Sequence, residues 1–180
     1  MRTQLILLIA ALLCTLVTQS QVTEGEWIDK ENEKVLLSIE KENDKLQLNL
    51  YDRSTEIVEK GLKSYALFKD QKIPLTFNTE KDILVFNKVA YIPVAKSMKG
   101  QFTGRWKSES DDTVFQVEID GNVELRWDII KGDDKPIRFW PKRTETGFHF
   151  TFGDKTLSYV LKDGVLIDAD GKKYSKVSEI

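Results

Sequence analysis

Cysteine and histidine are almost missing from this sequence of 180 residues, and their scarcity excludes several kinds of site. The single cysteine is Cys14 and the single histidine is His149. The common zinc sites need several cysteine or histidine ligands. A catalytic triad would have to use His149, in a chain without the Gly-x-Ser-x-Gly sequence that presents a nucleophilic serine. We therefore predict no metal site, no cofactor and no catalytic residues, which makes the protein non-enzymatic.

An excess of charge of one sign is also missing. The chain has 27 Lys and Arg residues against 29 Asp and Glu residues, and the two signs are interleaved along it. Proteins that bind nucleic acid through its phosphates carry a cationic face or stripe. We therefore expect no nucleic-acid partner.

A long apolar run occurs near the N-terminus and nowhere else. It covers residues 5–17, follows Arg2 and precedes the short polar segment 18–20, which is the arrangement of a secretory signal peptide. A membrane-spanning helix needs roughly 20 apolar residues, and this run is shorter. We predict a signal peptide over residues 1–20 that is cleaved after Ser20, export to the periplasm or the exterior, and no stable membrane span afterwards.

Cys14 lies inside this run and raises the alternative of a lipoprotein. Lipid attachment usually requires a small residue just before the cysteine, and Leu13 stands there. We therefore do not expect lipidation at Cys14. Without this residue the mature chain has no cysteine, so its stability must come from a packed core and not from disulfides.

Apolar and polar residues alternate along most of the remaining chain. A period of two is typical of strands with one buried face. The Asp-Gly pairs at 120–121 and 163–164 each separate two apolar runs, which predicts two-residue hairpin turns. We expect about six short antiparallel strands per repeat, a helix or an edge strand over residues 54–60, and a connecting segment over 95–103. The clearest alternations are those of Leu46, Leu48 and Leu50 and of Phe148, Phe150 and Phe152.

Two halves of the chain carry the same pattern, which predicts an internal duplication. Gly-x-Trp occurs at residues 25–27 and again at 104–106, so that Trp27 and Trp106 lie 79 positions apart. Repeated units keep a nearly constant offset even when loops change length. Further matches follow in the same order: Val35, Leu37 and Ile39 with Phe115, Val117 and Ile119; Leu46, Leu48 and Leu50 with Val123, Leu125 and Trp127; 75–77 with 157–159; 83–85 with 165–167; and Tyr91 with Tyr174.

A Gly-x-Trp sequence that opens an antiparallel meander resembles the first motif of the lipocalin superfamily. Each repeat is also similar to the small lipocalin-like β domains of secreted bacterial proteins, whose last strand has the pattern found at residues 171–177. The resemblance implies a barrel closed at one end by the tryptophan. The Thr-Asp-Tyr motif of the superfamily is absent, and no arginine on the last strand is placed to cover the tryptophan. We expect Lys176 to cover Trp106 instead, by a cation–π contact.

We predict an all-β fold from these patterns. Two tandem antiparallel β-meander repeats, over residues 21–96 and 97–180, pack as a lipocalin-like barrel or sandwich. A repeat of this size buries little core by itself, so we expect the two to pack together. Small barrels of this kind fill their interior with side chains or hold one small ligand, and the sequence leaves both possibilities open.

Aromatic residues concentrate in the second repeat, which favours it as the functional one. Ile137 and Phe139 share one face of a predicted strand, which places Arg138 and Trp140 on the other. An outward tryptophan beside an arginine is typical of interface hot spots; the alternative is that Trp140 folds over the rim of the barrel. We predict a binding site made of Arg138, Trp140, Arg126, His149 and Tyr159.

Three functions remain to be compared. The first is an exported binding protein that engages a protein partner, as inhibitors and immunity proteins do. The second is a lipocalin-like carrier of a small apolar ligand, which needs a cavity of about 300 Å³ or more. The third is a hydrolase of envelope or carbohydrate that works through two carboxylates. No pair of carboxylates stands out in the sequence, so we rank the hydrolase last.

Overall fold

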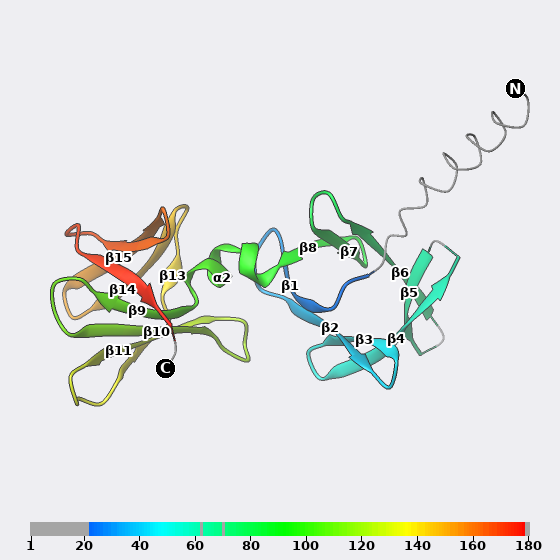
Figure 1. The fold of residues 1–180 in the computed structure, drawn as a ribbon, viewed down its shortest axis with the longest axis horizontal. Helices are drawn as coiled ribbons and strands as arrows, with labels where there is room; N and C mark the ends of the chain where they lie inside the picture. Colours follow the sequence, from blue (N-terminus) through cyan, green and yellow to red (C-terminus); the bar gives the residue numbers. More distant parts are fainter. Residues whose placement is uncertain (1–21, 62, 70, 179–180) are drawn as a thin grey trace, which may run out of the picture. The chain divides into compact units, whose positions relative to one another are not determined.

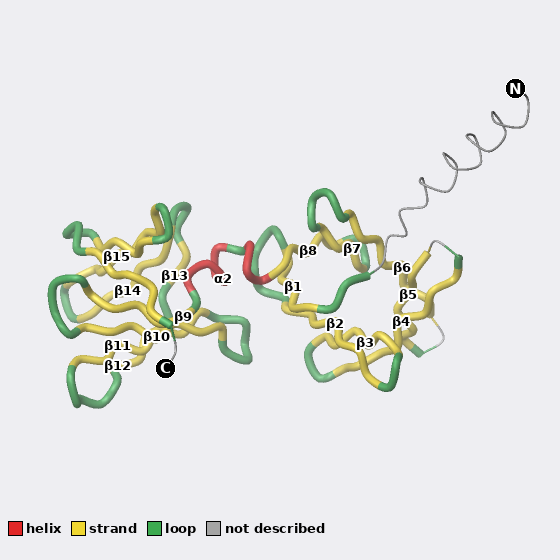
Figure 2. The backbone as a smooth tube through the Cα atoms, viewed as in Figure 1, coloured by secondary structure: helices red, strands yellow, loops and turns green. Residues whose placement is uncertain are grey.

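The structure is a computed structural model that describes residues 22–61, 63–69 and 71–178 (Figure 1). The predicted signal peptide and Cys14 lie outside the described residues. Strands make up most of the described chain, and helix is confined to a short segment in its middle (Figure 2). The predicted all-β fold is therefore confirmed.

The first eight strands form a closed antiparallel barrel in sequential order. Strands that follow one another in the chain are also neighbours in this sheet, which is the meander expected from the alternating pattern. The strands are β1 (Gly25–Asp29), β2 (Leu36–Glu42), β3 (Lys45–Leu50), β4 (Arg53–Lys60), β5 (Lys63–Phe68), β6 (Gln71–Asn78), β7 (Ile83–Phe86) and β8 (Val89–Pro93).

The remaining nine strands form a second antiparallel sheet, in the order β12-β11-β10-β9-β17-β16-β15-β14-β13. Its two edges, β12 and β13, follow one another in the chain, so the sheet is interrupted between them. These strands are β9 (Gly104–Ser108), β10 (Thr113–Ile119), β11 (Leu125–Lys131), β12 (Ile137–Phe139), β13 (Lys142–Arg143), β14 (Gly147–Phe152), β15 (Lys155–Lys162), β16 (Val165–Asp168) and β17 (Lys173–Val177).

The chain divides by its contacts into two compact units. Among the described residues, the first unit contains 22–25 and 37–91, and the second contains 26–36 and 92–178. Each of the two meanders makes its own sheet, so one barrel shared by both repeats is not formed. The first and the last of the residues matched in the sequence lie on the first and last strands of the two meanders: Trp27 and Trp106 on β1 and β9, and Tyr91 and Tyr174 on β8 and β17. The duplication itself stays a prediction.

Three local expectations were wrong. Residues 54–60 are neither helix nor edge strand, because Thr55 and Ile57 are both buried in strand β4, which pairs with β3 and β5. The short helix is instead α2 (Met98–Phe102), where the side chain of Ser97 accepts the N–H of Gly100 at 2.9 Å. There are also more strands than the six expected per repeat.

The two Asp-Gly pairs behave differently. At 163–164 a two-residue turn joins β15 to β16, with φ of 52° and 77°, as predicted. At 120–121 the loop is longer, because the carboxylate of Asp120 accepts the N–H groups of Asn122 and Glu124 and holds five residues between β10 and β11.

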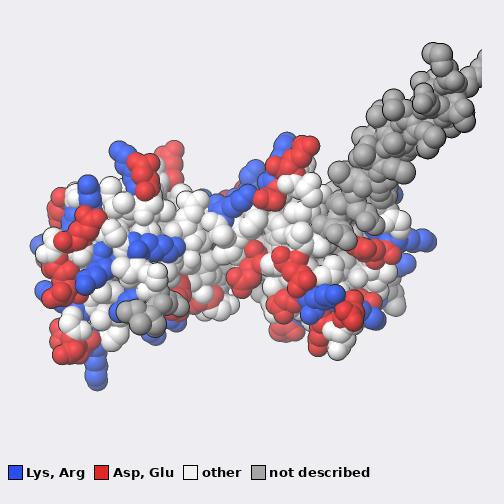
Figure 3. All heavy atoms as spheres, in the orientation of Figure 1, with Lys and Arg blue, Asp and Glu red and all other residues white. Residues whose placement is uncertain are grey.

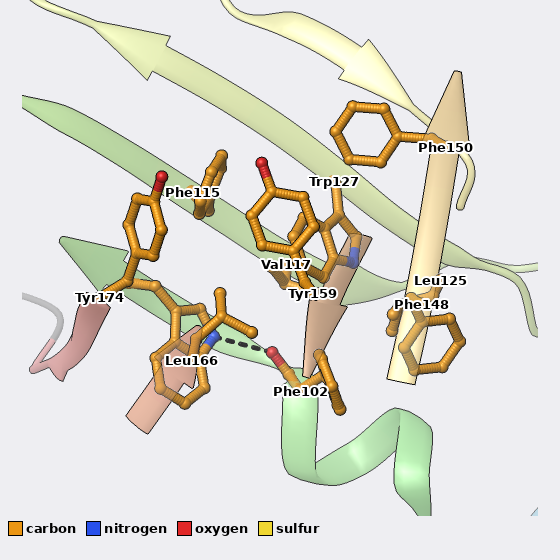
Figure 4. Close-up of a cluster of buried hydrophobic side chains, with 11 residues drawn as sticks. Phe102, Phe115, Val117, Leu125, Trp127, Phe148, Phe150, Tyr159, Leu166 and Tyr174 are labelled. Carbon is orange, nitrogen blue, oxygen red and sulfur yellow. Dashed lines mark hydrogen bonds between the residues drawn. The ribbon is translucent and has the colours of Figure 1, made fainter. Parts of the chain in front are cut away.

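Aromatic rings fill the interior of the second sheet (Figure 4). Trp127 is fully buried and lies 4.8 Å from the ring of Tyr159, 5.4 Å from that of Phe115 and 6.2 Å from that of Phe102, measured between ring centroids. The buried cluster consists of Phe102, Trp106, Phe115, Val117, Leu125, Trp127, Phe148, Phe150, Tyr159, Leu166 and Tyr174. The alternation expected for β14 ends before Phe152, whose side chain is 55% exposed.

Gly104 and Trp106 show why the second meander needs its Gly-x-Trp sequence. The Nε1–H of Trp106 donates to the carbonyl of Phe102 at 2.8 Å, marked by the dashed line in Figure 4. The ammonium of Lys176 lies 5.4 Å from the centre of the Trp106 ring, which confirms the predicted cation–π cover. Gly104 has a φ of 119°, and a Cβ there would lie 2.5 Å from Cε of Lys176. Only glycine leaves room for this cover without backbone strain.

We expect Gly104→Ala to lower the free energy of unfolding by about 1–3 kcal/mol, because it adds strain at a positive φ and displaces Lys176. Gly121→Ala is the matched control, since a Cβ at Gly121 meets no atom within 4 Å, and it should stay within about 0.5 kcal/mol of the wild type. Thermal and urea denaturation would measure both. Equal stability of the two variants would contradict the role assigned to Gly104.

Candidate functional site

Arg138 is held rigidly on the outer face of β12. It stands opposite Asp128 in the ladder between β11 and β12, and its Nε and Nη2 donate to the two carboxylate oxygens of Asp128 at 2.7 and 3.1 Å. These hydrogen bonds, together with the negative charge of Asp128, raise the pKa of Arg138. The side chain of Arg138 remains half exposed, whereas that of Asp128 is 10% exposed. The guanidinium is therefore oriented before any partner arrives.

Arg126 belongs to the same network of charges. It stands opposite Glu118 in the ladder between β10 and β11 and pairs with the carboxylate of Glu118, while its Nε lies 3.5 Å from the second oxygen of Asp128. The structure thus brings together two of the predicted site residues, Arg126 and Arg138, through one shared carboxylate. Such a network fixes the positions of long side chains that are otherwise mobile on a surface.

Trp140 follows β12 directly and lies at the surface. Its side chain is 55% exposed, and its Nε1–H donates to Oδ2 of Asp120 at 3.2 Å. Partial burial alone would raise the pKa of Asp120, but the N–H of Glu124, the indole of Trp140 and the N–H of Asn122 outweigh it and lower the pKa. Trp140 is thus an exposed ring held by an ionised carboxylate.

His149 and Tyr159 do not share this surface. His149 is half-buried on β14, between Lys142 of β13 and Ser158 of β15 in the ladder. Tyr159 is 4% exposed, and burial, followed by the charges of Asp168 and Asp170, raises the pKa of its hydroxyl. Its ring belongs to the packed interior, so Tyr159 supports the fold and is not presented to a partner.

Apolar side chains extend the exposed surface along the interrupted edge of the sheet. Ile137 is 50% exposed, and the ring of Phe139 stacks on Phe150 at 4.3 Å and meets Phe152 edge-on at 5.8 Å. Phe139 thus closes the gap between the sheet edges with its side chain and without backbone hydrogen bonds. We call this region, made of Ile137, Arg138, Phe139, Trp140 and Phe152, the β12 edge.

Glu33 and Lys99 are two buried charged residues that contact each other elsewhere in the second unit, and no sequence pattern indicated this contact. Glu33 is 3% exposed, and its carboxylate accepts the backbone N–H groups of Met98 and Lys99, both at 2.9 Å. The ammonium of Lys99 donates to the carbonyl oxygens of Glu33, at 2.7 Å, and of Val123. Arg143 adds a second cation 3.6 Å from the carboxylate of Glu33. Residues about 65 positions apart in sequence meet here, which no local pattern encodes.

Asp29 fixes the loop that carries Glu33. Its carboxylate accepts the N–H groups of Asn32, Lys34 and Val35 at 2.7–2.8 Å. Ser108 stands two positions after Trp106 as Asp29 stands after Trp27, and its hydroxyl accepts the N–H groups of the next loop in the same way. In both meanders, the side chain two positions after the tryptophan therefore stabilises the following loop by accepting hydrogen bonds from backbone N–H groups.

Charges of both signs are mixed over the visible face of each unit (Figure 3). Among the described residues, no group of His, Cys, Asp and Glu is arranged to hold a metal ion. No helix in the described part of the chain is long and apolar enough to cross a membrane. No family model and no curated protein sequence matches the chain.

We expect Trp140→Ala to change the free energy of unfolding by less than about 1 kcal/mol, because the ring is exposed and makes a single surface hydrogen bond. Trp127→Ala is the matched comparison: it removes a fully buried ring and should cost about 3–5 kcal/mol. Thermal denaturation of both variants gives the answer. A large loss of stability in Trp140→Ala would mean that this ring is part of the core.

Acid should weaken the loop that Asp29 holds. Burial alone would raise the pKa of Asp29, but its backbone hydrogen bonds, led by that from Asn32, lower it below the ordinary value of 3.8. A carboxylate with a depressed folded pKa stabilises the fold above that ordinary value, and the stabilisation is lost as pH falls through the folded pKa. We expect Asp29→Asn to cost about 1–3 kcal/mol at pH 7.

The difference in unfolding free energy between the wild type and Asp29→Asn should shrink as the pH falls from 5 towards 2. Urea titrations at several pH values would measure it, with Asp112→Asn, a change at an exposed loop carboxylate, as the control. A difference that stays constant down to pH 2 would contradict the assignment.

Proposed function

We propose that this protein is an exported, non-enzymatic binding protein that engages a protein partner through the β12 edge, in the manner of an inhibitor or an immunity protein. The observation that carries the proposal is Trp140, a ring 55% exposed and held in place by Asp120. Tryptophan and arginine dominate the hot spots of protein interfaces, and here Arg138 stands two positions away.

Preorganisation strengthens the proposal. An interface loses affinity when it must order long side chains on binding. Asp128 already fixes Arg138, and Asp120 already fixes Trp140. Ile137 and Phe152 are each about half exposed and add apolar area to the β12 edge.

Side chains are the recognition elements at this edge. β12 is three residues long and is flanked by Pro136 and Pro141, and proline at a short edge strand discourages pairing with a strand of another protein. A partner would thus contact the β12 edge through Trp140 and Arg138 and not through a continued sheet.

Export is part of the proposal and rests on the N-terminal sequence. The charged, apolar and small polar regions of residues 1–20 support a cleaved signal peptide and a periplasmic or secreted location. A chain without cysteine after position 14 is insensitive to the oxidising conditions found there.

The two other functions receive less support. A carrier of an apolar ligand needs space inside a barrel, and the interior of the second sheet is occupied by rings whose centroids lie 4.7–6.2 Å apart. The hydrolase needs two carboxylates in reach of one bond, and the two carboxylates beside the β12 edge, those of Asp120 and Asp128, are engaged by Trp140 and Arg138.

The test is native mass spectrometry of tagged protein recovered gently from its own host. We expect a stoichiometric protein complex that Trp140→Ala weakens by roughly 30-fold or more, since hot-spot truncations cost about 2 kcal/mol or more. Tyr51→Ala is the control, because Tyr51 is 72% exposed and lies in the other unit; it should leave the dissociation constant unchanged. An added mass of a few hundred daltons in place of a protein would favour the carrier instead.

A further inference from the structure

A pocket of about 370 Å³ opens in the second unit beside Trp140, and the proposed protein partner does not account for it. Its size falls in the range of small-molecule sites. Four of its lining residues are cationic, namely Lys34, Lys99, Lys142 and Arg143, and one, Glu124, is a carboxylate. In a chain whose total charge is nearly balanced, this concentration of cations is local and favours an anionic ligand.

Lys99 gives the clearest sign of a ligand. An ammonium has three N–H donors, and that of Lys99 uses two of them on the carbonyl oxygens of Glu33 and Val123. Among the described residues no acceptor is found for the third. The side chain is 5% exposed and lines the pocket. A buried ammonium that leaves one N–H without an acceptor costs free energy, and a bound ligand can supply the missing acceptor.

Neighbouring charges leave the pocket positive. Glu33 is committed to α2 and lies 3.6 Å from Arg143, and Glu124 adds a second negative charge. Burial lowers the pKa of Lys99, while the charges of Glu124 and Glu33 act to raise it. The two carboxylates offset two of the four cations, which leaves the pocket with a net positive charge that an anionic ligand reduces.

Apart from Asn32, the rest of the pocket wall is apolar. Leu125, Pro141 and Phe148 line it together with the ring of Trp140. A ligand that buries itself here must therefore present apolar atoms as well as an anionic group. A small inorganic anion would contact the cations but would leave the apolar part of the wall without a contact.

We propose that this pocket binds an organic acid, a carboxylate that carries an apolar body, with the carboxylate at Lys99, Lys142 and Arg143 and the body against Trp140 and Phe148. Such a group can come from a free small acid or from the C-terminus of a protein chain. The pocket shares Trp140 with the β12 edge, but its cations are not part of that edge, so the acid and the proposed protein partner can be tested separately.

The experiment is a titration of the ¹⁵N-labelled protein with 3-phenylpropionate, followed by the indole N–H resonance of Trp140. We expect a saturable shift. The neutral amide 3-phenylpropionamide, which lacks the charge, and acetate, which lacks the apolar body, should each bind at least ten-fold more weakly. Equal shifts with the amide, or no shift with 3-phenylpropionate, would overturn the proposal.

Two matched double variants locate the site. Lys34→Gln with Lys142→Gln removes two pocket cations and should weaken 3-phenylpropionate roughly five- to ten-fold, as expected for partly exposed charge pairs. Lys131→Gln with Lys135→Gln removes the same charge from exposed positions outside the pocket and should have no effect. An equal loss in both double variants would show a general charge effect and reject the site.

A third titration separates the two sources of the acid. N-acetyl-glycyl-phenylalanine carries the same carboxylate and ring at the end of a peptide. Binding at least three-fold tighter than that of 3-phenylpropionate would assign the pocket to a protein C-terminus, and weaker binding would assign it to a free acid. The protein partner is tested separately, since Trp140→Ala can abolish its complex while the double variant Lys34→Gln with Lys142→Gln leaves it intact.

Discussion

The aromatic rings inside the second sheet are packed so closely that they leave little space for a ligand there. Trp127 touches Phe102, Phe115, Phe150 and Tyr159 with ring centroids 4.8–6.2 Å apart. Interiors packed to this density have no room for a ligand without rearrangement. We therefore propose that recognition takes place outside this interior, at the β12 edge and at the pocket beside Trp140.

The same packing explains the edge itself. The sheet is interrupted between its edge strands β12 and β13, and the ring of Phe139 on β12 stacks on Phe150 of β14. The chain crosses the interruption at Trp140 and Pro141, so the tryptophan stands outside the core on a short and well anchored segment. Asp120 and Asp128 each come from strands or loops already fixed by the sheet, and they hold Trp140 and Arg138 in turn. These two carboxylates therefore fix the exposed side chains of Arg138 and Trp140 relative to the packed core.

Sequence patterns predicted the all-β meanders because alternation and tight turns are local properties. The cover of Trp106 by Lys176 was also predictable, since one missing arginine left few residues on the last strand to replace it. The interior position of strand β4 was missed, because the pattern of residues 54–60 fits a helix or an edge strand, while the burial of Thr55 and Ile57 depends on both neighbouring strands. Outward placement of Arg138 and Trp140 followed from strand alternation.

The pocket was not predictable, because Glu33 and Lys99 meet only after folding and neither stands in a motif. Tyr159 was grouped with the binding residues on composition alone, which does not separate a buried ring from an exposed one.

The most direct measurement is the set of tryptophan indole N–H resonances when the labelled protein binds its isolated partner. Recognition at the surface predicts that the Trp140 resonance shifts while that of Trp127 stays in place. A shift of Trp127 with Trp140 unchanged would place the ligand inside the sheet and contradict surface binding.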